Sequence, residues 1–252
     1  MKRARFFCRP ISKPVVKLTG TEAHHLAGVL RGRVGETVEL FDGQGTLAEA
    51  TITEITKGRV ILEVKQLHVL PRRAVGRVII ASSLAKGERF AGLISRCTEL
   101  GVERISPVRF ERTIKQARGN DIAGRYEKLA LAAAKQCERW FLPQIDPPRL
   151  LADALASLRK DYPQAEILVG SLSTKAGNIL QSSNPDNDVV VFVGPEGGLT
   201  DGEQKLLLEY GAKETRLTDT VLRIETAALA FAAILIAQRQ DFKHRQPNPA
   251  LE

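Results

Sequence analysis

The segment that most constrains this chain is a glycine turn between an apolar strand and the start of a helix. Val189-Val-Val-Phe-Val-Gly194 is nearly all apolar, as expected of a strand in a parallel sheet covered on both faces. Gly194-Pro-Glu-Gly-Gly-Leu-Thr200 follows, and Thr200-Asp-Gly-Glu203 is a capping box that predicts a helix start. Ligands of open α/β sheets bind in such turns, at the carboxyl ends of strands. The segment therefore predicts an α/β domain with a ligand site in this turn.

The glycine turn matches neither of the two common nucleotide-binding motifs. It lacks the spacing of G-x-G-x-x-G, and it lacks the lysine of G-x-x-x-x-G-K-[ST]. Glycines at this place allow close backbone approach to a ligand or a positive φ. A tight strand-to-helix connection without a ligand remains the alternative from this motif alone.

Strand and helix patterns alternate through the C-terminal two-thirds of the chain, which predicts an α/β fold with a mainly parallel sheet. The expected strands are Arg77–Ser82, Arg104–Val108, Glu166–Ser171, Val189–Gly194 and Lys213–Leu217. The expected helices are Phe90–Leu100 with Gly101 as its C-cap, Ile122–Trp140, a helix from Thr200 that ends at Gly211, and Glu225–Gln240.

The first 70 residues have a different pattern, that of a small barrel or sheet. Strands are predicted at Thr37–Phe41, Thr46–Ile55 and Arg59–Val64, with a hairpin turn at Asp42-Gly43 and a helix at Thr21–Leu30. Residues 1–73 hold 13 Lys and Arg against 7 Asp and Glu, in a chain of formal net charge +8. This excess favours a nucleic-acid-binding part, with a solubility bias as the alternative.

A second polar motif, Leu217-Thr-Asp-Thr-Val-Leu-Arg-Ile-Glu-Thr-Ala227, joins the last strand to the last helix. Arg223, Glu225 and Thr226 cluster where the helix begins. An acidic side chain and a hydroxyl at a helix N-terminus also serve as caps, so capping is the simpler interpretation of this motif alone.

Taken together, the two motifs resemble those of the RsmE-like ribosomal RNA small-subunit uridine N3-methyltransferases, in the SPOUT class of knotted methyltransferases. The resemblance runs from Arg5 to Ala237 and extends to three further segments, which are Cys97-Thr-Glu-Leu-Gly-Val102, Gln136-Cys-Glu-Arg139 and His25-Leu-Ala-Gly-Val-Leu-Arg31. The chain departs from the family pattern at Arg96, where lysine is expected, and at Lys135, where an acidic residue is expected. Asp219 and Thr220 stand near an expected glycine.

The resemblance implies a PUA-like RNA-binding barrel over residues 1–72, a SPOUT domain with a deep trefoil knot over 73–244, and a flexible tail over 245–252. It also implies that three loops bind S-adenosyl-L-methionine. Mapped onto this sequence, the donor-binding residues are Gly170, Leu172, Gly194, Pro195, Glu196, Gly197, Gly198, Leu217, Leu222, Arg223, Glu225, Thr226 and Ala227.

The chemistry implied is methylation of uridine N3 in 16S rRNA, with uridine 1498 of the decoding region as the family target. Arg223 is the candidate for stabilising negative charge on the uracil, so we expect its side chain to face the donor pocket. Glu196 and Glu225 are the candidate bases, although each carboxylate could instead bond backbone amides. Candidate RNA-binding residues are Arg3, Arg5, Arg9, His25, Arg31, Arg33, Arg72 and Arg73.

The expected partner is 16S rRNA, within the 30S subunit, and the resemblance implies a homodimer. Two alternatives stay open, which are another SPOUT enzyme acting on tRNA or rRNA ribose and a non-catalytic ribosome-assembly factor. The four histidines and three cysteines do not have metal-ligand spacing, so we expect no metal. No apolar run approaches the roughly 18 residues of a membrane span, and no signal peptide pattern follows the basic N-terminus. We therefore expect a cytoplasmic protein.

Overall fold

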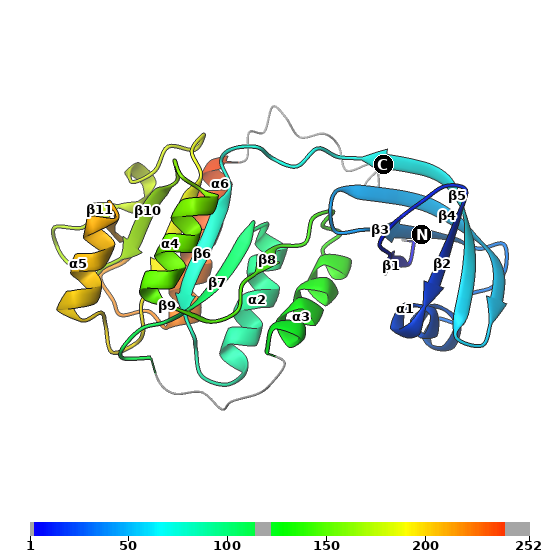
Figure 1. The fold of residues 1–252 in the computed structure, drawn as a ribbon, viewed down its shortest axis with the longest axis horizontal. Helices are drawn as coiled ribbons and strands as arrows, with labels where there is room; N and C mark the ends of the chain where they lie inside the picture. Colours follow the sequence, from blue (N-terminus) through cyan, green and yellow to red (C-terminus); the bar gives the residue numbers. More distant parts are fainter. Residues whose placement is uncertain (1–2, 114–121, 240–252) are drawn as a thin grey trace. The chain divides into compact units, whose positions relative to one another are not determined.

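The structure, a computed structural model, describes residues 3–113 and 122–239 (Figure 1). The chain divides into two compact units. One contains the residues up to Arg72 together with Leu131–Leu142, and the other contains Arg73–Ala130 and the residues from Pro143 onward. Residues 131–142 fall within the second domain expected from the sequence, residues 73–244, although they belong to the first compact unit. The tail expected at 245–252 lies outside the described residues.

The first unit is built on a five-stranded sheet with the order β1-β3-β4-β5-β2. β1 and β3 are parallel, and the other neighbours are antiparallel. The described edge strands β1 and β2 do not pair with each other, so the sheet forms a half-barrel. The strands are β1 (Arg5–Phe7), β2 (Val15–Thr19), β3 (Thr37–Phe41), β4 (Thr46–Thr56) and β5 (Arg59–Val69). The three predicted strands are confirmed, whereas β1 and β2 were not anticipated.

The hairpin predicted at Asp42-Gly43 joins β3 to β4. The carboxylate Oδ1 of Asp42 accepts the N–H groups of Gln44 and Thr46 at 2.7 and 2.9 Å. Gly43 and Gly45 adopt φ values of +68° and +103°, which side chains other than glycine rarely tolerate. The helix expected at Thr21–Leu30 is divided into α1 (Gly20–His24) and a π-helical turn η1 (His25–Val29). Each element buries one side chain against the sheet, which is Ala23 in α1 and Leu26 in η1.

Residues 131–142 contribute an apolar side to the first unit. Helix α3 (Ile122–Gln136) ends four residues before the predicted end, and Ala134, Trp140 and Leu142 join a cluster with Phe41. Lys135 donates from Nζ to both carboxylate oxygens of Glu22, at 3.0 and 2.9 Å. The lysine that departs from the family pattern therefore has an acidic partner in α1.

The second unit contains an eight-stranded sheet in which all the pairs between described strands are parallel. Its order is β11-β13-β10-β12-β6-β7-β8, and β9 also pairs with β7. The strands are β6 (Val78–Ser83), β7 (Arg104–Arg109), β8 (Gln144–Ile145), β9 (Arg149–Leu150), β10 (Glu166–Gly170), β11 (Gly177–Asn178), β12 (Val189–Val193) and β13 (Lys213–Arg216). The predicted α/β fold with a mainly parallel sheet is confirmed. β13 lies between β10 and β11, which precede it in the chain, an arrangement consistent with the implied knot.

Helices cover both faces of this sheet (Figure 1). Side chains of β6 and β12 alternate between two apolar clusters, one shared with α2 (Glu88–Leu100) and α6 (Ile224–Arg239), the other with α4 (Leu151–Asp161) and α5 (Asp201–Glu209). A short 3-10 turn, η2 (Ile179–Gln181), lies between β11 and β12. Helix α4 was not anticipated from the sequence. None of the described helices is long and apolar enough to cross a membrane.

Two predicted helix ends are confirmed at the level of single hydrogen bonds. Gly101 caps α2 with φ of +98°, and its N–H bonds to the carbonyl of Thr98. At the start of α5, the N–H of Glu203 bonds to the hydroxyl of Thr200, and the Thr200 N–H bonds to Oε2 of Glu203 at 2.9 Å. The glycine turn is therefore held in place directly before α5.

Candidate functional site

A cavity of about 350 Å³ lies at the carboxyl ends of β10, β12 and β13. Its wall is formed by residues within three chain segments, 169–172, 193–199 and 217–222, together with side chains of α5, β13 and α6. These segments contain the three loops that the resemblance assigns to the donor. Neighbouring parallel strands end at the same edge of the sheet, which is why segments far apart in the sequence meet here.

Nine of the thirteen expected donor-binding residues line this cavity, and four do not. The lining residues are Gly170, Leu172, Gly194, Pro195, Glu196, Gly198, Leu217, Leu222 and Ala227. Gly197, Arg223, Glu225 and Thr226 are not among the lining residues. The last three lie at the start of α6, where the cavity is lined by Ile224, Ala227 and Phe231. That spacing is one face of a helix, so the intervening side chains point elsewhere.

Two glycines of the cavity are required for different reasons. A Cβ at Gly170 would lie 3.2 Å from Cε2 of Phe231, so the absence of a side chain lets α6 pack closely against the end of β10. Gly198 has φ of +72°, in the left-handed region that favours glycine. The glycine turn is thus shaped by its own backbone torsions.

Two arginines hold the glycine turn from outside the cavity. Nη1 of Arg112 donates to the carbonyls of Gly197 and Leu199, at 2.9 and 3.3 Å. Nη1 of Arg89, in the first turn of α2, lies 3.1 Å from Oε1 of Glu196. Glu196 therefore lines the cavity while its carboxylate forms an ion pair. Neither arginine was anticipated, since each lies over 80 residues from the turn in sequence.

One wall of the cavity carries a carboxylate that sequence reasoning missed. Oε1 of Glu214, on β13, accepts from Nε2 of Gln204 at 2.9 Å and from Oγ of Ser171 at 3.3 Å. All three residues line the cavity. No local motif marks Glu214, because it stands in a four-residue strand whose position becomes clear only when the sheet is assembled.

The expected catalytic residues occupy different positions around the cavity. Arg223 is exposed and is not a lining residue, contrary to our expectation that its side chain faces the pocket. Its carbonyl accepts the N–H of Ala227 at 2.9 Å, so its backbone belongs to the first turn of α6. Glu225 is half-buried, and its Oε2 is buried without a hydrogen bond among the described residues. Of the three expected catalytic residues, Glu196 lines the cavity.

The candidate RNA-binding residues divide by their exposure. Arg31 and Arg33 are exposed after η1, and among the described residues their guanidinium groups have no hydrogen-bond or ion-pair partner. Arg3 pairs with Glu49, and Arg9 donates to the carbonyl of Asp42. Both remain at the surface.

Four further candidates are engaged by the fold to different degrees. The side chain of Arg5 is 5% exposed, and its Nε lies 2.8 Å from Oε1 of Glu39. Its guanidinium also stacks over the ring of Phe41, so a structural role fits Arg5 better than a phosphate contact. His25 is half-buried and packs edge-on to Phe6. Arg72 and Arg73 are exposed, Arg72 over the ring of Phe141 and Arg73 bonded to the carbonyl of Arg239.

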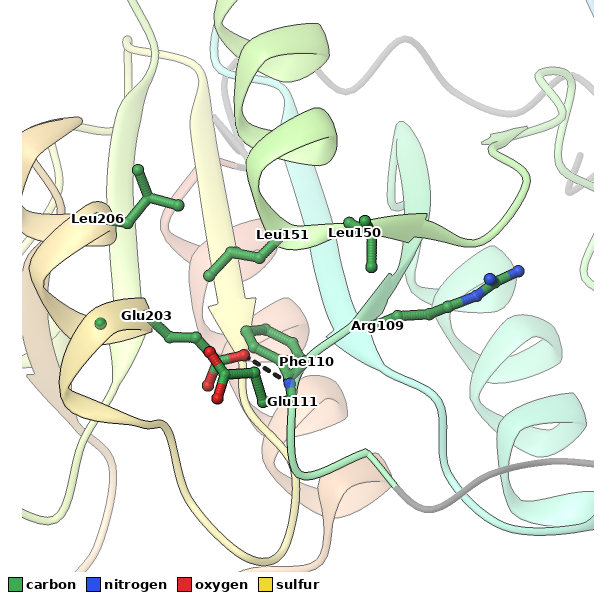
Figure 2. Close-up of a pocket in the computed structure, with 8 residues that line it drawn as sticks. Arg109, Phe110, Glu111, Leu150, Leu151, Glu203 and Leu206 are labelled. Carbon is green, nitrogen blue, oxygen red and sulfur yellow. Dashed lines mark hydrogen bonds between the residues drawn. The ribbon is translucent and has the colours of Figure 1, made fainter.

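A second cavity, of about 300 Å³, lies beyond the end of β7 (Figure 2). It is lined by Arg109, Phe110, Glu111, Leu150, Leu151, Gly202, Glu203 and Leu206, none of which is an expected site residue. The buried carboxylate of Glu203 accepts the N–H of Glu111 at 2.7 Å, in addition to its bond with Thr200. Its acidic group is therefore used by the fold itself. The described residues also contain no group of three or more His, Cys, Asp or Glu side chains that could hold a metal ion.

Comparisons with known proteins match both units. Residues 71–236 match the model of the RNA methyltransferase domain, and residues 18–65 match that of the RNA methyltransferase PUA domain. The chain is 31% identical to a protein of Synechocystis sp. named Ribosomal RNA small subunit methyltransferase E, over 86% of this chain and 71% of that protein. A protein of the same name from Bacillus subtilis is 29% identical, over 88% of this chain and 90% of its own length.

A solved structure has the same fold over nearly the whole chain. It is a Ribosomal RNA small subunit methyltransferase E from Neisseria gonorrhoeae, 28% identical, which covers 95% of this chain and 99% of its own with a TM-score of 0.84. That protein was crystallised bound to S-adenosyl methionine.

Proposed function

This chain belongs to the RNA methyltransferase family, and from that premise we propose that it transfers a methyl group from S-adenosylmethionine to N3 of a uridine in 16S rRNA. The expected resemblance to the RsmE-like group of the SPOUT class is confirmed, as is the PUA-like character of the first unit. The proposed target base is uridine 1498, in the decoding region. The relatives' name supports the small-subunit RNA as substrate.

The observation that carries the proposal is the cavity at the carboxyl ends of β10, β12 and β13. Its volume of about 350 Å³ is in the range of small-molecule sites. Apolar side chains such as Leu217, Ile224 and Phe231 provide surface for an aromatic base, and the backbone of the glycine turn allows close approach. The carboxylate of Glu214 provides a hydrogen-bond acceptor. These features fit a nucleoside carrying both apolar and polar groups.

When bound, the donor supplies a methyl group on a positively charged sulfur. The residues of the chain then have to hold the donor in position and exclude water, because correct positioning supplies a large part of the rate enhancement in a transfer between two bound molecules. The glycine turn, tied by Arg112 and Arg89, and the close packing of Phe231 on Gly170 provide a rigid site.

N3 of uridine carries a proton that has to leave during the transfer. Glu196 is the better placed of the two candidate bases, because it lines the cavity and Glu225 does not. Arg223 follows the lining residue Leu222 and is exposed, so its guanidinium is accessible to a base that approaches from solvent. In that position it would stabilise the negative charge that develops on the uracil oxygens.

The first unit would hold the RNA backbone. Arg31 and Arg33 are exposed basic side chains whose guanidinium groups are not engaged by the described residues, as phosphate contacts require. The proposal includes the 30S subunit as the substrate particle and the cytoplasm as the location. It also includes a homodimer, in which the half-buried apolar side chains of α6 would contribute to the interface.

The experiment is a methylation assay with labelled S-adenosylmethionine and either 30S subunits or naked 16S rRNA, followed by digestion to nucleosides. We expect label in 3-methyluridine. Label in a 2′-O-methylated nucleoside would point to a ribose methyltransferase instead. RNA binding without any transfer of label would favour a ribosome-assembly factor.

A further inference from the structure

The carboxylate of Glu214 is held in the wall of the donor cavity by two neighbouring side chains. Gln204, on α5, donates from Nε2 to Oε1 at 2.9 Å, and Ser171, directly after β10, donates from Oγ to the same oxygen at 3.3 Å. The three residues come from three separate elements that meet at the carboxyl edge of the sheet. Since both donors are neutral, they orient the carboxylate and leave its charge in place.

The second oxygen of this carboxylate has a different environment. Both hydrogen bonds go to Oε1, and Oε2 of Glu214 has no hydrogen-bond or ion-pair partner among the described residues. A carboxylate oxygen has room for two hydrogen bonds, and those formed by a charged acceptor are stronger than neutral ones. An oriented carboxylate with one uncommitted oxygen in a cavity wall is therefore ready to accept from a ligand.

We propose that Glu214 determines the specificity of the cavity for a ribonucleoside, by accepting hydrogen bonds from the ribose hydroxyls of the methyl donor. This inference rests on the proposed function. The ribose carries two vicinal hydroxyl donors and no charge. Acidic side chains near the carboxyl ends of strands bind ribose hydroxyls in the same way in other α/β folds.

The amino-acid end of the donor is a less suitable partner. It carries a carboxylate beside its ammonium group, so the negative charge of Glu214 would meet repulsion there as well as attraction. The ribose presents no such conflict. Gln204 and Ser171 are positioning residues in this arrangement, because they touch Glu214 and fix the direction of its free oxygen.

The test is calorimetric titration of wild-type protein, Glu214→Gln and a matched control, Glu209→Gln. Glu209 is an exposed residue of α5 that pairs with Lys205 and does not line the cavity. The ligands are S-adenosylmethionine, S-adenosylhomocysteine, and the 2′-deoxy and 3′-deoxy forms of S-adenosylhomocysteine. We expect Glu214→Gln to bind the first two ligands roughly 10- to 100-fold more weakly than wild type, the loss typical of one hydrogen bond to a charged group.

The deoxy ligands identify the contact. If Glu214 binds a ribose hydroxyl, at least one deoxy ligand has a lower affinity for wild-type protein than S-adenosylhomocysteine has. Its affinity should fall little further in Glu214→Gln, because removing the hydroxyl and removing the carboxylate abolish the same interaction. If the affinity lost by removing the hydroxyl and the affinity lost in Glu214→Gln simply add, Glu214 contacts another part of the donor, and the proposal is overturned. A loss confined to S-adenosylmethionine would assign Glu214 to the charged sulfur and overturn it as well, as would wild-type affinity in Glu214→Gln.

Folding and the proposed function are controlled separately. Thermal unfolding of each variant shows whether it is folded, and Glu214→Asp retains the charge on a shorter side chain. It should show the same ligand pattern with an intermediate loss, so it decides the question if Glu214→Gln does not fold. Failure of the wild-type protein to bind S-adenosylmethionine would instead contradict the proposed function.

Discussion

The guanidinium of Arg112 donates to the carbonyl of Gly197 at 2.9 Å, across 85 positions of sequence. The same nitrogen reaches the carbonyl of Leu199 at 3.3 Å. Arg112 thereby binds the residues on both sides of Gly198, the glycine with positive φ. Arg112 itself does not line the cavity. A side chain far from the donor motif is thus part of what gives that motif its shape.

Replacing Arg112 should therefore weaken donor binding without altering the rest of the fold. Each of its two hydrogen bonds is worth about 1 kcal/mol, so Arg112→Ala should lower the affinity for S-adenosylmethionine by up to about 30-fold in calorimetry. Arg125→Ala is the control, because Arg125 is also an exposed arginine but pairs with Glu88. Equal affinities for both variants would show that the turn keeps its shape without Arg112.

The two adjacent glycines of the turn should respond differently to the same substitution. Gly198→Ala forces an alanine to φ of +72°, which costs about 1–2 kcal/mol. A Cβ at Gly197 would meet the Arg112 side chain at 3.4 Å, an ordinary contact distance. We expect about 10-fold weaker donor binding for Gly198→Ala and a smaller change for Gly197→Ala. The reverse order in a titration would contradict the loop geometry described above.

Arg31 and Arg33 should contribute to RNA affinity and not to donor affinity. Removing one phosphate-binding side chain should reduce the slope of log affinity against log salt by about 0.7 to 0.9. The double variant Arg31→Ala/Arg33→Ala should therefore bind 16S rRNA more weakly, with a slope flatter by roughly 1.5 units. Arg59→Ala is the control, because Arg59, on β5, is already paired with Glu54 of β4. A slope equal to that of wild type would mean that the basic loop serves solubility alone.

Arg223 should affect the rate of transfer more than donor affinity. Its side chain is exposed beside the cavity, so the interaction we propose forms with the RNA base and not with the donor. Arg223→Lys keeps the charge but not the planar, multiple-donor group, and loss of one such donor costs on the order of 100- to 1000-fold in turnover. Single-turnover methylation of 30S subunits, beside donor titration, measures both effects. Equal losses in rate and affinity would make Arg223 a binding or structural residue.

Features that depend on a few consecutive residues could be predicted from the sequence. The apolar run at Val189–Val193, the glycine turn after it and the capping box of Thr200 and Glu203 all appear in the structure as expected. The same holds for the C-cap at Gly101 and for the hairpin turn at Asp42. Backbone torsions and hydrogen bonds within about four residues determine such features, so the residues that specify them are neighbours in the chain.

Features that depend on which elements become neighbours required the tertiary structure. Helix α4 was not anticipated, and residues 131–142, which were expected in the second domain, belong to the first compact unit. In both cases the apolar side chains find partners far away in sequence. Arg5 looks like an RNA-binding residue in a basic N-terminus, yet it is buried beside Glu39 and Phe41. Burial is set by packing across the sheet, which the composition of a segment does not reveal.

The donor cavity combines both kinds of information. The sequence by itself determined the glycine turn and the start of α6. The family resemblance that these two motifs carry then gave nine residues that line the cavity, including Gly170 and Leu172 at the end of β10. Only the tertiary structure joined Glu214 to Gln204 and Ser171, and turned Ile224, Ala227 and Phe231 toward the cavity while leaving Arg223 exposed. The physical reason is that β13 pairs with β10 across more than 40 residues of sequence, and this non-local pairing decides which side chains share the wall of the site.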